Sequence, residues 1–203
     1  MGHIIAVLMV GAAALVAGCG ESVHKEHRER EATMALKERT GLVTVHGSPL
    51  TLLGPEVKVG DAAPDFTVVD AEFKPVKLSD FRGQTVLLAA VPSLDTPVCS
   101  LETKRFNDEA ERLPENVVVL TVSEDLPFAQ ARFCGAENIK KIRVLSDSVQ
   151  KDFGKKYGVL IKENGLLARS IWVIGPDGKI KYREIVPELS NHPDYDKALA
   201  AVR

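Results

Sequence analysis

The chain has 203 residues, with 26 lysines and arginines against 28 aspartates and glutamates, and a formal net charge of −2. This balance offers no basic footprint for nucleic acid, so a nucleic-acid partner is not expected. From Gly41 onward the composition is that of a globular protein, and the remaining stretch of about 160 residues fits one domain with one core.

The N-terminal segment has the pattern of an export signal. Ile4 to Ala17 are almost wholly apolar, a run too short for a transmembrane helix, which needs about 20 residues, but typical of a signal peptide. The small residues before Cys19 resemble the lipobox of bacterial lipoproteins, in which the cysteine receives a diacylglyceryl thioether. We therefore predict a signal peptide over residues 1–18 and lipidation of Cys19. Met1-Gly2-His3 lacks the usual positive charge, and an ordinary cleaved signal peptide or an uncleaved anchor is the alternative.

Residues 19–40 are predicted to be a tether that starts at the lipidated Cys19. From residue 21 this segment is dense in charge of both signs and poor in large apolar residues, so it cannot build a core. It contains His24 and His27, but a solvated linker is favoured over a metal site there. The expected location is therefore outside the cytoplasm, on a membrane-anchored lipoprotein that faces the periplasm or the cell exterior.

The domain predicted over residues 41–203 begins with a β-hairpin, because two short apolar runs flank Gly47-Ser48-Pro49. Strands and helices then alternate before a second hairpin, whose turn is Gly175–Gly178. This order predicts a thioredoxin-like α/β fold, with a central mixed β-sheet flanked by helices. The expected strands are 42–46, 50–53, 65–70, 76–78, 85–91, 116–122, 142–145, 170–174 and 179–185, and the expected helices are 97–112, 126–134, 148–157 and 195–202.

Cys99 stands in the first turn of the helix that follows the apolar strand 85–91. Thr96 is a good N-cap residue, and Pro97 suits the first helical position. Unpaired backbone N–H groups and the helix dipole favour a thiolate at this point, and the thiolate is the nucleophilic form of cysteine. The sequence thus predicts a reactive cysteine, with a small buried hydrophobic residue as the alternative.

Cys134 is placed differently, at the C-terminus of the helix 126–134 and directly before Gly135, a natural C′ residue. The dipole there disfavours a thiolate. If Cys19 carries lipid, two of the three cysteines remain, and the oxidising cell exterior allows them to pair. Because they lie on different helices, a disulfide between Cys99 and Cys134 would require local unwinding. A static structural disulfide, or none, is the alternative.

The motif Pro92-x-x-x-Thr96-x-x-Cys99 is similar to the Pro-x-x-x-Thr/Ser-x-x-Cys signature of peroxiredoxins. Longer strings resemble the thiol peroxidase branch of that family, an atypical two-cysteine group. The resemblance spans about Thr44 to Val202 and does not cover residues 1–40. The strings that carry it are PSLDTPVC (92–99), DLPFAQARFC (125–134), YGVLI (157–161) and GLLARS (165–170).

The resemblance implies a thiol-specific peroxidase that reduces hydrogen peroxide and organic hydroperoxides without a metal or other cofactor. Cys99 would be the peroxidatic cysteine, and Cys134 would resolve its sulfenic acid as an intramolecular disulfide. Thr96 would hydrogen-bond the sulfur and the peroxide, Pro92 would shield the thiolate from water, and Arg169 would hold the thiolate and polarise the O–O bond. Without the resemblance, Arg169 reads as a surface charge at a strand end.

The resemblance also implies a homodimer and recycling by thioredoxin or, outside the cytoplasm, by an exported thioredoxin-like donor. Contact with the membrane is expected through the lipid alone. Two other functions stay open from the residues. One is a protein dithiol–disulfide oxidoreductase, against which the missing Cys-x-x-Cys motif weighs; the other is a non-catalytic tethered module whose disulfide stabilises the fold.

Overall fold

The structure is a computed structural model that describes residues 36–202. The predicted signal peptide, Cys19 and most of the predicted linker lie outside the described residues. Between residues 36 and 202, no helix has the length and apolar character needed to cross a membrane.

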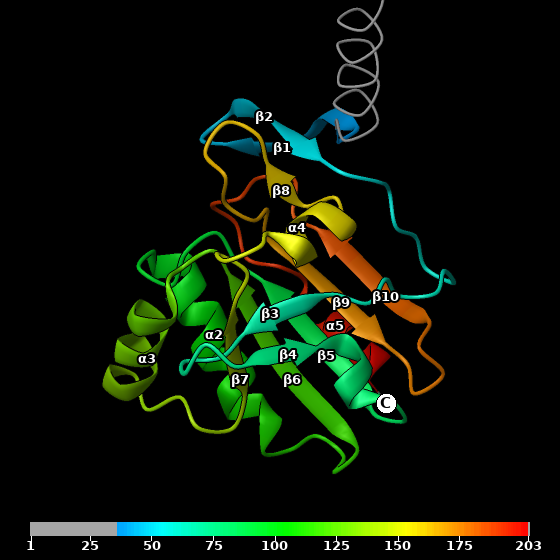
Figure 1. The fold of residues 1–203 in the computed structure, drawn as a ribbon, viewed down its shortest axis with the longest axis vertical. Helices are drawn as coiled ribbons and strands as arrows, with labels where there is room; N and C mark the ends of the chain where they lie inside the picture. Colours follow the sequence, from blue (N-terminus) through cyan, green and yellow to red (C-terminus); the bar gives the residue numbers. More distant parts are fainter. Residues whose placement is uncertain (1–35, 203) are drawn as a thin grey trace, which may run out of the picture. The chain divides into compact units, whose positions relative to one another are not determined.

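Seven strands form the central sheet, in the order β10-β9-β5-β6-β7-β3-β4 (Figure 1). The inner strands β5, β6 and β7 run parallel, and the outer strands join them antiparallel. This is the predicted mixed sheet of a thioredoxin-like fold. The bounds are β3 Thr67–Val69, β4 Pro75–Lys77, β5 Thr85–Ala90, β6 Val117–Ser123, β7 Arg143–Ser146, β9 Ser170–Ile174 and β10 Ile180–Ile185.

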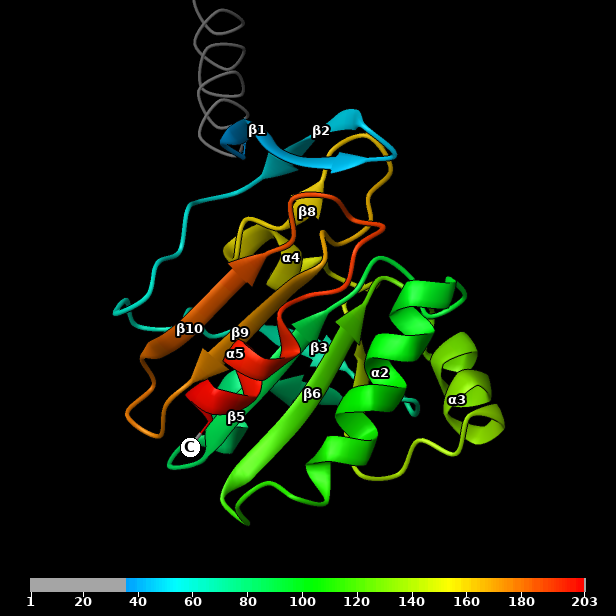
Figure 2. The same cartoon turned by 180° about the vertical axis from the view of Figure 1, so that it is seen from behind.

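Helices cover both faces of this sheet, and β5 is buried between them. Helices α2 (Pro97–Ala110) and α5 (Tyr195–Ala201) lie over one face (Figure 2), and α4 (Asp152–Lys156) lies over the other. Leu87 and Ala89 of β5 belong to the core with α2 and α5, whereas Val86, Leu88 and Ala90 belong to the core on the α4 side. Burial on both faces explains why the strand is apolar throughout.

A separate antiparallel sheet contains β1 (Glu38–Val45), β2 (Ser48–Leu53) and β8 (Leu160–Ile161). The first two strands are the predicted N-terminal hairpin. Its turn residues His46 and Gly47 have φ angles of 48° and 76°, the positive pair that a type I′ turn requires. Strand β1 starts before residue 41, because Glu38 pairs with Leu53. The sequence did not predict β8, since two residues carry no periodicity.

The ends of α3 (Pro127–Ala136) differ from the prediction. Gly135 lies inside the helix and is not its C′ residue. Asn138 takes the left-handed conformation instead, with φ 55°, and the N–H of Ile139 donates to the Cys134 carbonyl at 3.0 Å. This is the Schellman arrangement, one helical turn later than expected. A short 3-10 helix, η1 (Leu78–Phe81), occupies the predicted turn after β4.

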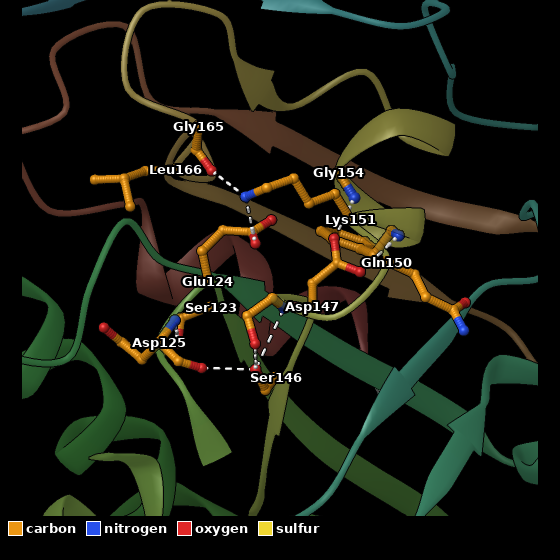
Figure 3. A network of polar contacts seen from close by, with 12 residues as sticks. Ser123, Glu124, Asp125, Ser146, Asp147, Gln150, Lys151, Gly154, Gly165 and Leu166 are labelled. Atoms are coloured by element: carbon orange, nitrogen blue, oxygen red, sulfur yellow. Dashed lines mark hydrogen bonds and ion pairs between the residues drawn. The ribbon is translucent and has the colours of Figure 1, made fainter. Parts of the chain in front are cut away.

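A buried acid pair joins the ends of β6 and β7 to α4 (Figure 3). Lys151 donates through Nζ to Glu124 at 2.9 Å and to the Gly165 carbonyl at 2.8 Å. Asp147 accepts from the N–H groups of Phe153 and Gly154 at 3.1 and 2.8 Å. Burial raises the pKa of Asp147 to about 7; the charge of Glu124 adds to this effect and the backbone donors oppose it.

We expect the Asp147→Asn variant to show a flatter dependence of stability on pH. The folded-state pKa of Asp147, about 7, lies above its ordinary value of 3.8, so the folded state holds a proton that the unfolded state releases between these values. The stability from protonated Asp147 is full below about pH 4 and is lost as the pH rises through about 7. Asparagine keeps an acceptor oxygen but does not titrate.

Urea unfolding at about pH 5 and about pH 8 measures the effect. Between these pH values the free energy of unfolding should fall by about 1–3 kcal/mol less in the variant than in the wild type. An unchanged slope in the variant would show that Asp147 is ionised in the folded protein throughout.

Candidate active site

Cys99 lies near the start of helix α2, which follows the central strand β5 in the chain. The chain leaves β5 at Ala90, turns through Pro92 and enters α2 at Pro97, so Cys99 occupies the first helical turn, as predicted. Thr96 is the N-cap residue. Cys99 is fully buried and packs against Val91 and Leu94 at the carboxyl end of the strand. Sheets of this kind place their ligands at that edge.

Arg169 reaches Cys99 because of the register between two strands. Ser170, the first residue of β9, pairs with Ala90, the last residue of β5. Arg169 therefore stands at the edge where Cys99 lies. Its side chain is 2% exposed, and its Nη2 donates to Cys99 Sγ at 3.3 Å. The reading of Arg169 as a surface charge is wrong.

Glu102 is the buried partner of Arg169, and the sequence analysis missed it. Arg169 Nη1 donates to Glu102 Oε2, and Arg169 Nε donates to the Leu189 carbonyl at 3.1 Å. The other oxygen of Glu102 has no hydrogen-bond partner among residues 36–202. Glu102 follows Cys99 by three positions, which puts both side chains on one face of α2. A carboxylate at that spacing was the signal that could have revealed it.

The pair keeps a permanent positive charge beside the sulfur. Burial opposes the charge on Arg169, but the Glu102 carboxylate and the Cys99 sulfur outweigh burial and raise the pKa of Arg169. Burial raises the pKa of Glu102 to about 7, against the lowering effect of Arg169. A guanidinium that donates to sulfur stabilises the thiolate relative to the thiol.

The loop before α2 is held by hydrogen bonds of two side chains, Thr96 and Asp125. Thr96 does not cap the helix with its hydroxyl, which donates to the Ser93 carbonyl at 2.9 Å. The lone pairs of that hydroxyl stay available to accept a proton donor. Asp125 directly precedes Leu126, the N-cap residue of α3. Asp125 accepts from the Leu94 N–H at 2.8 Å and from the Ser93 hydroxyl at 2.7 Å.

A cavity of about 480 Å³ opens beside these residues, and its walls are mostly apolar. Arg169, whose guanidinium contacts Cys99 Sγ, forms part of the wall, so a small molecule in the cavity reaches the group beside the sulfur. Three predicted site residues lie in this wall, Pro92, Thr96 and Arg169. The other lining residues are Val45, His46, Leu50, Pro97, Val98, Ile161, Asn164, Leu166, Leu189 and Ser190.

Cys134 lies in a different part of the core. It is half-buried in the last turn of α3 and packs against the cluster shared with α2 and α5. Cys99 and Cys134 are both free thiols in this structure. Their clusters share Phe133 and Val144 as flanking residues. Burial raises the pKa of Cys134. The structure therefore brings together Cys99, Arg169, Thr96 and Pro92, and leaves Cys134 unbonded to Cys99.

A thioredoxin-like sheet with a buried cysteine at a helix start, held by an arginine, defines a thiol-dependent redox protein. Comparison with known proteins agrees. Residues 58–199 match the family model described as Redoxin. The thiol peroxidase of Bacillus subtilis is 49% identical over 161 residues, which cover 79% of this chain and 96% of the relative. The thiol peroxidase of Oceanobacillus iheyensis is 51% identical over 158 residues, with 78% and 96% covered.

A solved structure, that of a peroxiredoxin-like protein from Aquifex aeolicus, is also similar. It has 44% sequence identity and a TM-score of 0.75, and the match covers 81% of this chain and 95% of that one. The chain belongs to the Redoxin family. Its function is accordingly that of a thiol peroxidase, an oxidoreductase of the peroxiredoxin type, as the sequence predicted.

Proposed function

We propose that Cys99 is the peroxidatic cysteine of this enzyme and that Cys134 resolves its oxidised form. The observation that carries the proposal is the contact of a buried, permanently charged Arg169 with Cys99 Sγ at 3.3 Å. A protein dithiol–disulfide oxidoreductase needs an accessible thiol, whereas Cys99 is fully buried beside a cavity suited to a small substrate. A non-catalytic module has no need of a cation at that sulfur.

The first step is a two-electron oxidation of sulfur. The Cys99 thiolate attacks one peroxide oxygen, the O–O bond breaks, and the other oxygen leaves as hydroxide or alkoxide, which takes a proton to give water or an alcohol. Negative charge grows on the leaving oxygen, so a fixed cationic donor at Arg169 lowers the barrier. The Thr96 hydroxyl, which donates to the Ser93 carbonyl, can accept the peroxide O–H. Pro92, in the cavity wall, keeps water from the thiolate.

The second step joins the two cysteines. The Cys134 sulfur attacks the Cys99 sulfenic acid, a disulfide forms, and water is released. Because Cys99 is buried and the two residues pack in separate clusters, the start of α2 or the end of α3 must unwind first. The family implies a peroxide substrate and a thioredoxin-type dithiol that reduces the disulfide and is itself oxidised. The apolar cavity wall suits organic hydroperoxides as well as hydrogen peroxide.

The stoichiometry of a single turnover tests the proposal. The reduced protein receives one equivalent of hydrogen peroxide, and free thiols and intact mass are followed from milliseconds to seconds. We expect rapid loss of two thiols and about 2 Da, with Cys99 linked to Cys134 by peptide mapping. Thiols that persist for minutes would contradict the peroxidatic role of Cys99. Disulfides that link other residues would contradict the role of Cys134.

We further propose that the protein is an exported lipoprotein anchored through Cys19, with an exported thioredoxin-like donor as its reductant. The support is the apolar run Ile4–Ala17 followed by small residues and a cysteine. Labelled fatty acid should enter the wild-type protein in a bacterial host, and the Cys19→Ser variant should take up none. Equal labelling of both would exclude this anchor.

We also propose a homodimer, in line with the family resemblance. Leu126 and Phe128 near the start of α3 are 60% and 64% exposed, and the Phe128 ring lies 5.1 Å from that of Phe73, which is 44% exposed. Exposed apolar groups of this size mark contact surfaces. Sedimentation velocity should show a dimer that Phe128→Glu weakens; a monomeric wild type at micromolar concentration would refute it.

A further inference from the structure

The carboxylate of Glu188 joins the N-terminal hairpin to the segment between β10 and α5. Its two oxygens accept from the Thr44 hydroxyl at 2.9 Å and from the N–H groups of His46 and Gly47 at 3.0 and 3.1 Å. They also accept from the N–H and hydroxyl of Ser190 at 3.1 and 2.5 Å. One side chain thus collects five donors from two segments that are far apart in the sequence.

The hairpin turn supplies a site shaped for a negative charge. His46 and Gly47 both have positive φ, so their successive N–H groups point to one side and form a concave anion-binding nest. The Glu188 carboxylate occupies that nest. The donors, above all the Ser190 hydroxyl, hold the pKa of Glu188 well below its usual range, so the carboxylate stays ionised at neutral pH.

Leu189, the next residue, carries the connection to the catalytic sulfur. Its N–H donates to the Thr44 carbonyl at 2.9 Å, and its own carbonyl accepts from Arg169 Nε at 3.1 Å. Arg169 in turn donates to Cys99 Sγ at 3.3 Å. Continuous contacts therefore run from the hairpin turn through the Glu188–Leu189 segment to the sulfur.

The same contacts shape the cavity. His46 of the hairpin turn lies in its wall together with Leu189 and Ser190, which flank or bind Glu188. Loss of the Glu188 carboxylate would remove the bonds that hold the hairpin turn at His46 and Gly47, and would leave the backbone bonds of Thr44 as the link to the 187–190 segment. The Leu189 carbonyl, which is one of the fixed partners of Arg169, would lose part of its support at the same time.

We propose that Glu188 is a positioning residue for the peroxide reaction: by docking the hairpin turn, it holds the Leu189 carbonyl that orients Arg169 against Cys99. This inference rests on the proposed function of Cys99. It makes the N-terminal hairpin part of the active-site support, although the hairpin contributes no atom to the chemistry. A small displacement of a group that acts on the transition state costs a large factor in rate.

The test compares Glu188→Ala with wild type in the full chain, at a temperature at which both are folded. Stopped-flow measurements separate Cys99 oxidation by hydrogen peroxide from the later formation of the disulfide. We expect the first step to slow about tenfold or more and the second to keep its rate, because Arg169 acts on peroxide cleavage. The control is Glu115→Ala. Glu115 is exposed and lies just before the start of β6, at the edge of the sheet opposite to Cys99, so this variant should react as wild type.

A purely structural role for Glu188 would lower the melting temperature and leave the oxidation rate at the wild-type value, and that result would overturn the proposal. If Glu188→Ala does not fold, Thr44→Val and Ser190→Ala each remove one donor, and each should slow oxidation to a smaller degree. Wild-type rates in both would overturn it equally. If Cys99 of the wild-type protein stays reduced after hydrogen peroxide is added, the proposed function itself is refuted. This result is distinct from a failure of the Glu188 proposal, in which the wild type is oxidised and the variants react at the same rate.

Discussion

The Cys99→Ser variant should consume no peroxide, whereas Cys134→Ser should consume about one equivalent per chain and then stop. A serine hydroxyl at position 99 stays protonated at neutral pH, so it offers no nucleophile to the O–O bond. Without Cys134, the Cys99 sulfenic acid forms but has no internal thiol to condense with. Peroxide loss under multiple turnover with a dithiol donor, together with the mass of the recovered protein, measures both effects.

The mass of the Cys134→Ser variant makes the comparison sharper. It should gain about one oxygen after the first equivalent of peroxide and further oxygens with excess, as the sulfenic acid proceeds to sulfinic and sulfonic acids. Turnover by Cys134→Ser at the wild-type rate would mean that the external donor reduces the sulfenic acid directly. If Cys99→Ser still consumed peroxide, a residue other than Cys99 would be the site of the reaction.

Local chemistry made part of the site predictable. Thr96, Pro97 and Cys99 lie within four positions, and cap preference, the fixed φ of proline and the helix dipole all act over that range. The buried strand β5 and the N-terminal hairpin were found for the same reason, since periodicity and turn residues are local signals. Fold class followed from the order of these elements, and the family resemblance pointed to Arg169.

Local signals of this kind could not predict contacts between segments that are far apart in the sequence. Asp125 had the pattern of a helix cap, and its partners Ser93 and Leu94 lie on another loop that meets it in the folded chain. The sequence analysis did not find Glu188, because three of its five donors belong to the distant N-terminal hairpin. A charged side chain in a sequence is most simply read as solvated. The partners that hold these carboxylates come from segments that meet only in the folded chain.

The end of α3 shows how a strong local preference can give way. Gly135 is the usual residue for a left-handed C′ position, yet the helix continues through it, and Asn138 takes that conformation. Asparagine tolerates positive φ because of its short polar side chain, so both Gly135 and Asn138 suit a left-handed C′ position. Tertiary packing then selects between them: Phe133 and Cys134 contact the core, and Ile139 is buried there after the turn.

Disruption of the buried pair of Arg169 and Glu102 should lower both the rate of Cys99 oxidation and the stability of the protein. Arg169→Met removes the cation from Cys99 and leaves the Glu102 carboxylate buried without its partner. We expect the rate of Cys99 oxidation to fall by about 10²–10³-fold. The free energy of unfolding should fall by about 3 kcal/mol at neutral pH, because the pKa of Glu102 rises above about 7 without Arg169, so the folded variant must hold a proton that the unfolded chain releases. The loss of stability should shrink at low pH, where Glu102 is protonated in the folded and the unfolded state alike.

The double variant Arg169→Met with Glu102→Leu separates stability from catalysis. Replacement of both members of a buried pair by apolar residues is often neutral or stabilising, so the double variant should regain most of the lost stability. It should not regain the rate, because no cationic donor returns to the cleaving O–O bond. Urea unfolding and stopped-flow oxidation of the four proteins complete the cycle. Recovery of the rate together with the stability would show that Arg169 acts through the fold and not on the transition state.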